Sequence, residues 1–337
     1  TIADIAQMKG ENRVLTQQGL KKLNQRKRAG IYYLLEATKF KKEFISSRDV
    51  GFVIAPKLNA AGRLKHAQIC VDLLITKNKE TAQQIATQLI TLNQERQKIG
   101  QNMLIESIKY VEGPKHSPDM NAITIAGPNW HSGIIGITAA QLAGKYSLPA
   151  VVIAFDNEIG RGSARSVSNI NIYQLLNECK DHFEKFGGHK QAAGFSIKPE
   201  NIEGFRQKFS EVCKSLISSK ELISTLNIDY TISPKEINLS LLKDIENLNP
   251  FGPGNPPPIF YTNQLKPIDF KTVGADNTHL KVTFSDESGK IILDGIGFGL
   301  SHKIDLLYNS SVELVFELDR NSWQGRESVQ LQLLDLK

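Results

Sequence analysis

The sequence predicts an α/β protein in three parts: a helical region, an α/β domain and a small antiparallel barrel. Three observations support this prediction. Apolar residues recur at helical spacing through most of residues 12–111, and β-type and helical runs alternate over residues 122–155. Short alternating segments separated by turns then fill residues 265–336. A chain of 337 residues is long enough for two or three domains.

The helical region begins with predicted helices over residues 12–24 and 30–45, separated by a turn at residues 28–30. Residues 67–111 predict one or two long helices whose Gln- and Lys-rich positions alternate with an apolar stripe. That pattern is typical of a connector packed along one face. The polar run 114–120 then predicts a domain boundary.

The next domain begins with a β-type run over residues 122–126, a loop, a helix over 134–146 and a second strand over 150–155. Such a unit implies parallel strands and a right-handed crossover, so we expect a mostly parallel sheet. Loops at 127–133 and 156–166 would follow its strands, where such sheets place ligands. The domain is completed by a helix over 170–185, a strand over 194–197 and a helix over 200–218.

A Pro- and Gly-rich run at residues 249–258 excludes helix and central strand. Five β-type segments follow it and fit a small antiparallel barrel, for which the oligonucleotide-binding (OB) fold is the leading candidate. The segments are 265–273, 278–285, 290–298, 312–318 and 328–336.

The composition, 40% hydrophobic and 23% charged, predicts a soluble globular protein. The apolar runs are too short to span a bilayer, and no secretory leader opens the chain. Three widely spaced cysteines fit reduced thiols better than disulfides or a zinc site. We therefore expect a cytoplasmic protein without membrane contact.

The positive charge is concentrated at the amino-terminal end. Residues 1–45 contain ten lysines and arginines against four acidic residues, and this excess equals the net charge of +6 of the whole chain. A local basic surplus favours a polyanionic partner, and a solvated helical face is the alternative.

Two segments predict a site that grips a phosphodiester. One places two arginines on a Gly/Ser backbone, and the other places a histidine after two glycines. Guanidinium forks suit phosphate oxygens, and glycines let backbone N–H groups reach them. Ordinary surface arginines and a structural histidine are the alternatives. The candidates are Arg161, Ser163, Arg165, Gly187, Gly188 and His189.

Two further segments have the same character. His131 and Ser132 precede a predicted helix, whose N-terminus is a ready anion site; a Ser–His nucleophile is disfavoured because no G-x-S-x-G elbow is present. Asn59 and Arg63 lie among small residues, so both are further candidates for phosphate contacts. Helix capping is the alternative for both segments. No His, Asp and Glu set has convincing metal spacing.

Together these segments resemble the RecJ family of single-strand-specific DNA exonucleases, in the DHH phosphoesterase superfamily. The resemblance extends along almost the whole chain, in the order of the family. The matching stretches are TIADI (1–5), GENRVLTQQGLKKLN (10–24), IAPKLNAAGRL (54–64), NWHSGIIGITAAQLAGKY (129–146), GRGSARSV (160–167), FGGHKQAAGFSI (186–197) and NPFGPGNPPPIF (249–260).

The resemblance implies four parts. Residues 1–45 would be the carboxyl-terminal tail of a DHH catalytic domain and residues 46–112 a helical connector. Residues 113–222 would form the DHH-associated α/β substrate-binding domain, and residues 223–337 an OB-fold-like nucleic-acid-binding domain. Because the chain opens in the middle of a domain, we expect it to be a fragment.

The resemblance also implies metal-dependent 5′→3′ hydrolysis of single-stranded DNA in repair and recombination. Two Mn²⁺ or Mg²⁺ ions would be the cofactors, with Asp4 as the counterpart of the last acidic metal ligand of the family. The Asp-x-Asp and Asp-His-His motifs of the family do not occur here, so the chain alone is expected to be inactive. Single-stranded DNA would be the partner, together with a single-strand-binding protein and a helicase.

Two other functions stay open: a non-catalytic single-strand-binding or scaffold protein, and a phosphoesterase for short RNA or cyclic dinucleotides. The extra barrel disfavours the latter, since it suits longer strands. In the barrel, some aromatic residues are either stacking platforms for bases or core residues. They are Trp323, Phe270, Phe284 and Phe298.

Overall fold

The computed structural model describes residues 1–113, 121–156, 158–167, 170–217, 225–274, 276–309, 311–323 and 325–337. The chain divides into two compact units. The first comprises Thr1–Gln25, Glu43–Gly51 and Leu226–Lys337, and the second comprises Arg26–Lys42 and Phe52–Thr225. No helix among the described residues has the length and apolar character needed to cross a membrane.

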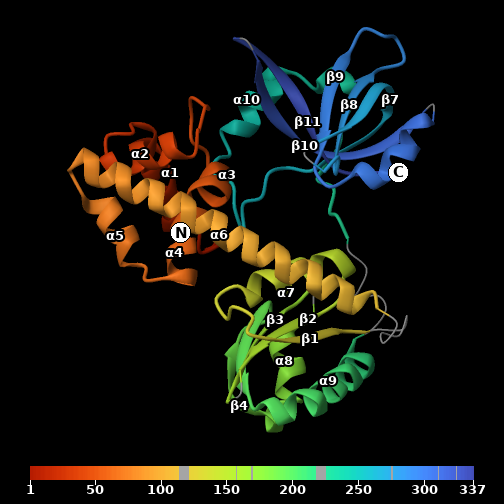
Figure 1. Cartoon of the computed structure of the whole chain (residues 1–337). Helices are drawn as coiled ribbons and strands as arrows, with labels where there is room; N and C mark the ends of the chain where they lie inside the picture. Colours follow the sequence, from red (N-terminus) through yellow and green to blue (C-terminus); the bar gives the residue numbers. More distant parts are fainter. Residues whose placement is uncertain are drawn as a thin grey trace. The chain divides into compact units, whose positions relative to one another are not determined.

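The second unit is built along one long helix, α6 (Lys79–Val111), which starts where the side chain of Asn78 accepts a hydrogen bond from the Thr81 N–H at 2.8 Å. Three shorter helices pack against its amino-terminal half (Figure 1). They are α2 (Ala29–Ala37), α4 (Ala55–Leu64) and α5 (Gln68–Ile75). The prediction of long helices over 67–111 is therefore confirmed.

The predicted helix over 30–45 is too long, because α2 ends at Ala37. Lys39 has a φ of +54°, in the left-handed region that a helix cannot continue through. The chain then reaches α4 by way of α3 (Ser47–Asp49) and a short π-helical turn at Val50–Ile54.

A five-stranded sheet follows, with the order β1-β2-β3-β5-β4. The first two strands, β1 (Ile123–Pro128) and β2 (Ala150–Phe155), are parallel and joined by α7 (Ile135–Tyr146). The predicted β-loop-α-β unit is therefore confirmed. The other strands are β3 (Gly160–Arg165), β4 (Phe183–Gly188) and β5 (Ala192–Ile197).

The prediction of a mostly parallel sheet is wrong, since every pairing beyond β1–β2 is antiparallel. Residues 156–159 join β2 to β3 and residues 189–191 join β4 to β5, and connections this short only reverse the chain. The predicted loop 156–166 is mostly strand. The predicted helix 170–185 stops early, because α8 (Ile172–Asn177) gives way to a 3₁₀ turn and then to β4.

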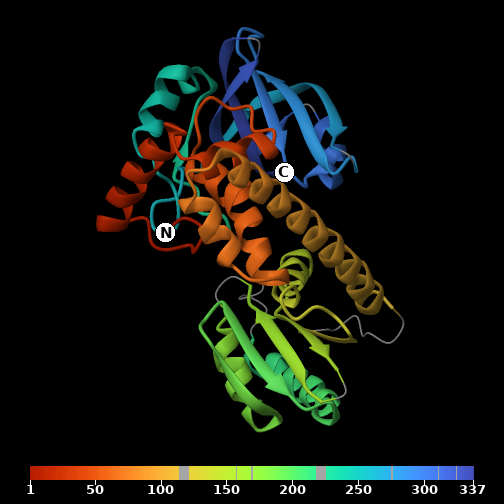
Figure 2. The same ribbon diagram turned by 60° about the vertical axis from the view of Figure 1, so that its left-hand side comes forward.

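The sheet is covered on both faces, as Figure 1 and Figure 2 show. Side chains alternate along β2: Val152 packs with α6 and α7, whereas Val151 packs with α8 and α9 (Ile202–Leu216). Phe205 and Phe209 of α9 are fully buried against this second face. The layers leave the carboxyl end of β1 and the start of α7 next to α4 and α6.

The first unit contains the predicted barrel. Its strands pair in the order β7-β8-β9-β11-β10, and β10 pairs back with β7 to close it. The pairs around the barrel are antiparallel except β9–β11, because the chain crosses to β10 beside β7 and β11 then returns in the direction of β9. A short further strand of the same sheet, β6 (Tyr230–Thr231), pairs with β7 in parallel. The strands are β7 (Phe260–Val273), β8 (His279–Ser285), β9 (Ile292–Gly297), β10 (Val312–Trp323) and β11 (Arg326–Leu336).

The Pro- and Gly-rich run of residues 249–258 seats the amino-terminal segment of this unit. The Met8 N–H donates to the Pro253 carbonyl at 2.6 Å, and the Ser47 hydroxyl donates to the Phe251 carbonyl at 3.0 Å. Proline removes N–H donors but leaves carbonyl acceptors, so a Pro-rich run suits this role. The helix α1 (Gly10–Asn24) follows the amino-terminal segment, and α10 (Leu239–Glu246) precedes the Pro- and Gly-rich run.

Candidate anion-binding site

Four cationic side chains of the second unit, Lys57, Arg63, Arg96 and Arg165, form a series in which each lies near the charge of at least one other. Burial and then the charge of Arg63 lower the pKa of Arg165, and the same two causes lower the pKa of Arg96. Burial and then Arg96 lower the pKa of Lys57. None of the four forms an ion pair with a carboxylate among the described residues. A partly buried positive cluster without acidic partners is typical of an anion-binding site.

Two glycines at the start of α7 let this cluster assemble. A Cβ on Gly133 would lie 2.5 Å from the Arg63 carbonyl oxygen, and the Gly133 carbonyl accepts from Arg63 Nη1 at 2.8 Å. A Cβ on Gly136 would lie 2.6 Å from Arg165 Nη2 and 2.9 Å from Ser163 Oγ. Both arginines therefore sit against the N-terminus of α7, where the helix dipole favours negative charge. The N–H groups of Gly133, Ile134 and Ile135 already donate to His131, so the cationic side chains offer the donors for a ligand.

The guanidinium of Arg165 is fixed by its own strand. Arg165 Nη1 donates to Ser163 Oγ at 2.9 Å and to the Ala164 carbonyl at 2.8 Å. Its side chain is half-buried, so the fork is oriented before any ligand arrives. The N–H groups of the guanidinium that these two hydrogen bonds do not use can donate to the oxygens of a phosphate or carboxylate ligand.

The loop between β1 and α7 is anchored at its other end by Trp130. The Trp130 indole donates to Glu106 at 2.9 Å and covers Gly127, where a Cβ would lie 2.3 Å from the ring. His131 follows, and its Nδ1 accepts from the Gly133 N–H at 3.1 Å. His131 therefore lies beside Arg63 with Nε2 uncommitted among the described residues, and Ser132 is exposed.

The glycine segment meets the arginine segment across the sheet. Ser163 pairs with Gly194, which pairs in turn with Gly187, so the three share one row and one face. A Cβ on Gly187 would meet no atom within 4 Å, and neither Gly187 nor Gly194 has a side chain to cover the backbone on this face. Gly188 has a structural role, because a Cβ there would lie 2.5 Å from the Ala192 carbonyl oxygen.

Other candidates lie at the edges of the site. Arg161 and Arg165 are four residues apart on an extended strand, about 13 Å along its axis, and not on one loop as predicted. His189 is exposed at the β4–β5 turn, where its Nδ1 accepts from the Gln191 N–H at 3.3 Å. Asn59 is exposed on α4, one turn before Arg63.

Asp4 lies exposed in the first unit. Within the described ranges, no group of three or more His, Cys, Asp or Glu side chains is arranged to hold a metal ion. Asp4 is one carboxylate, and the residues described here do not by themselves fit a two-metal centre.

Lys57 and Arg96 were not predicted as site residues. Arg96 follows Asn93 by one turn within the buried stripe of α6, between Leu89 and Met103. Its Nη2 donates to Asn93 Oδ1 at 3.0 Å, and its Nε is buried without a partner among the described residues. Two polar residues inside an apolar stripe, Asn93 and Arg96, are the sequence pattern that points to Arg96.

Comparison with known proteins places these parts in one family. Residues 119–215 match the DHHA1 domain, and residues 228–335 match the RecJ OB domain. The chain is 32% identical to the single-stranded-DNA-specific exonuclease RecJ of Bacillus subtilis, over 99% of this chain and 42% of that protein. It is 33% identical to the protein of the same name from Haemophilus influenzae, over 98% of this chain and 59% of that protein.

The fold has been solved in a relative. The structure of RecJ from Thermus thermophilus in complex with Mn²⁺ matches with a TM-score of 0.84 and 27% identity, covering 100% of this chain and 48% of that chain. Its complex with Mg²⁺ matches with a TM-score of 0.83. Fold and site define a DHH-associated α/β domain combined with an OB barrel. The chain belongs to the RecJ family, and it spans about half the length of the relatives it matches.

Proposed function

We propose that this chain is the substrate-holding part of a RecJ-type exonuclease that hydrolyses single-stranded DNA from its 5′ end. The observation that carries the proposal is the partly buried cluster of Lys57, Arg63, Arg96 and Arg165 at the N-terminus of α7. A terminal phosphate carries about −1.5 to −2 charges at neutral pH, against one for an internal phosphodiester. Four cationic side chains that have no carboxylate partner among the described residues therefore favour a terminal phosphate over an internal phosphodiester.

The arginine forks of Arg63 and Arg165 would bind the phosphate oxygens, and the Ser163 hydroxyl and His131 would donate to them. The row of Gly194 and Gly187 would let the strand lie close to the sheet. The remaining candidates would contact the strand at the edges of this site. They are Asn59, Ser132, Arg161, Gly188 and His189.

The cleavage step is proposed by relation to the Mn²⁺ and Mg²⁺ complexes of RecJ. Such ions, when bound as a pair, supply an activated water and stabilise the departing oxygen. In this proposal Asp4 contributes one carboxylate, and the other ligands belong to parts of the protein outside this chain. This chain then orients the strand and does not cut by itself.

The proposal keeps the four-part division at residues 45, 112 and 222, with the barrel binding the strand further along. Phe298 is 56% exposed and suits base stacking, whereas Phe284 is fully buried in the barrel core and does not. A role in repair and recombination beside a single-strand-binding protein and a helicase is part of the proposal. So is a cytoplasmic location, which fits the three free cysteines.

The test compares oligo-dT carrying a 5′-phosphate with oligo-dT carrying a 5′-hydroxyl, by fluorescence anisotropy at fixed salt. We expect the phosphate to tighten binding about tenfold, roughly the 1.4 kcal/mol of one charge-assisted contact. Arg63→Ala and Arg165→Ala should each abolish the difference, and Lys214→Ala, on the exposed face of α9, should keep it. Equal binding of both ends by the unaltered chain would overturn the proposal.

The alternative, a non-catalytic single-strand-binding protein, is favoured by the lack of a metal-holding group among the described residues. It predicts the same binding but no cleavage. Incubating the full-length gene product with Mn²⁺ and labelled oligo-dT separates the two functions.

A further inference from the structure

A second basic feature of the same unit plays no part in the site above. A groove of about 860 Å³ lies between the start of α2 and the connection from α5 to α6. Five of its lining residues are lysines or arginines, and none is acidic. The residues that matter for the argument are Lys27, Arg28, Tyr32, Thr76, Lys77 and Lys79.

The lysines of this groove are exposed and uncommitted. Lys27, Lys77 and Lys79 form no ion pair within the part of the chain that the structure describes. Arg26 is different, because its Nη2 donates to the Lys42 carbonyl at 2.7 Å and its guanidinium lies over Phe40. The lysines, and not Arg26, therefore supply the charge for a ligand.

The two walls of the groove are packed directly on each other. A Cβ on Gly30 of α2 would lie 1.9 Å from the carbonyl oxygen of Leu73 on α5, so only glycine allows this contact. Arg28 Nη1 spans the same walls to the Leu74 carbonyl at 3.5 Å. The groove is thus formed in advance of binding, which lowers the entropic cost of filling it.

An aromatic ring completes the surface. Tyr32 is 44% exposed and makes an edge contact with Tyr33, with ring centroids 5.2 Å apart and planes at 85°. A pinned, exposed ring beside cations is the arrangement that binds single-stranded nucleic acid, where bases stack and phosphates meet lysines. An acidic peptide would satisfy the lysines but leave the ring unused.

We propose that this groove is a second contact for the single strand, remote from the phosphate cluster. Lys79 of the groove and Arg96 of the cluster lie on the same helix, α6, about 25 Å apart at 1.5 Å per residue. At about 3.4 Å per stacked nucleotide, roughly seven nucleotides separate the two contacts. The inference rests on the proposed function, which identifies the ligand as single-stranded DNA. It adds a second site that binds the same strand.

The test uses this chain and two 5′-phosphorylated oligonucleotides, dT4 and dT30, in anisotropy titrations over a range of salt. The groove variant is Lys27→Gln/Lys77→Gln/Lys79→Gln, and the matched control is Lys180→Gln/Lys208→Gln/Lys214→Gln, three exposed lysines elsewhere in the unit. We expect the groove variant to bind dT30 at least tenfold more weakly, with the slope of log K against log salt reduced by up to about 2. Binding of dT4, which is too short to reach the groove from the cluster, should not change.

Photocrosslinking gives a readout that does not depend on the folding of a variant. In the unaltered chain, dT30 substituted with 5-iodouracil should crosslink to Tyr32. Unchanged dT30 binding by the groove variant, or no crosslink at Tyr32, would overturn the proposal. So would tight binding of a poly-glutamate peptide that displaces no dT30, since the groove would then serve an acidic protein segment. If the unaltered chain binds neither oligonucleotide, the proposed function itself fails.

Discussion

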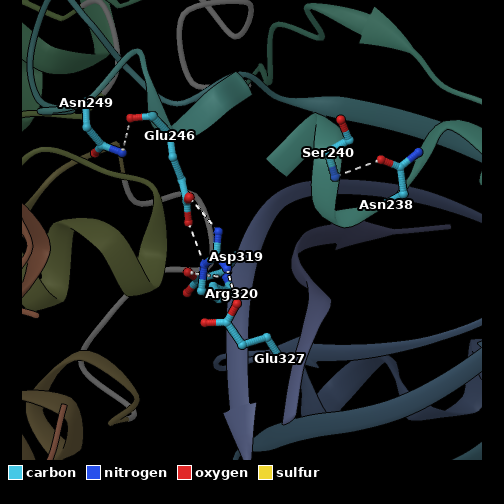
Figure 3. Close-up of polar contacts among 7 residues, drawn as sticks. All are labelled: Asn238, Ser240, Glu246, Asn249, Asp319, Arg320 and Glu327. Carbon is cyan, nitrogen blue, oxygen red and sulfur yellow. Dashed lines mark hydrogen bonds and ion pairs between the residues drawn. The ribbon is translucent and has the colours of Figure 1, made fainter. Parts of the chain in front are cut away.

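Arg320 on β10 and Glu246 on α10 form a bidentate ion pair, with Nε to Oε1 at 2.8 Å and Nη2 to Oε2 at 2.6 Å (Figure 3). Arg320 Nη1 also donates to Glu327 on β11. The hydrogen bonds that Arg320 donates to Glu246 are the main reason that the pKa of Arg320 is raised. The pair fastens α10 to the barrel just before the Pro- and Gly-rich run that seats the amino-terminal segment.

Arg320→Lys should therefore loosen α10. A lysine is a point charge and cannot make the two parallel bonds of the guanidinium fork. Because both side chains are about a third exposed, solvent screens the pair, and we expect a loss of only about 1 kcal/mol in the free energy of unfolding. Urea denaturation measures it. Arg326→Lys, at an exposed position on β11, is the control and should change nothing.

Gly133→Ala should destabilise the chain and weaken phosphate binding together. The added Cβ would lie 2.5 Å from the backbone oxygen of Arg63, so α4 must move away from the start of α7. Gly144→Ala is the matched control, because its Cβ would meet nothing within 4 Å on the exposed face of the same helix. We expect Gly144→Ala to stabilise by about 0.5–1 kcal/mol. Thermal unfolding with and without phosphate measures both effects.

Side-chain periodicity predicted most elements of the fold but not the sheet direction. The run Arg161–Arg165 contains glycine, serine and alanine, and nothing in it has strong strand propensity. It is a strand because β2 and β5 flank it and because Gly162 lies under the Phe195 ring, where a Cβ would be 2.1 Å from Cζ. Pairing partners distant in sequence decided the conformation.

The site was predicted in part for the same reason. Arg63, Ser163 and Arg165 stood out because small residues surround them, and His131 because it precedes a predicted helix. The structure brings these four together. Arg96 lies in a long helix that has many solvated polar residues, and its role appears only when Arg63 of α4 is placed beside it. A sequence pattern can identify residues whose neighbours along the chain are unusual. It cannot identify the role of residues such as Arg96, whose unusual neighbours are brought near only by folding.

Inorganic phosphate should stabilise the chain. Repulsion among Arg63, Arg96 and Arg165 opposes folding until an anion neutralises it. At a hundredfold excess over its dissociation constant, a ligand of the folded state adds about 2.7 kcal/mol. The measurement is the melting temperature in phosphate against chloride at equal ionic strength. Arg165→Gln should remove the effect of phosphate, and an equal rise in this variant would contradict specific binding.

The stability of the second unit should fall between pH 9 and pH 11. Burial is the main cause that raises the pKa of the Cys179 thiol, to about 11, and burial also raises the pKa of Cys213. The folded state therefore holds these protons more tightly than the unfolded state. Above the ordinary value of 9.0 the unfolded thiols ionise first, and stability is lost until the folded thiols ionise too.

For Cys179 the shift from 9.0 to about 11 corresponds to a loss of about 2.7 kcal/mol, at 1.36 kcal/mol per pKa unit. Urea unfolding at pH 8 and at pH 10.5 should show it. Lysines and tyrosines also titrate in this range, so the comparison is with Cys179→Ala/Cys213→Ala, which keeps every other titrating group. The double variant should be less stable at pH 8 because of its cavities, yet lose less stability on going to pH 10.5. A pH dependence equal to that of the unaltered chain would show that the buried thiols are not its cause.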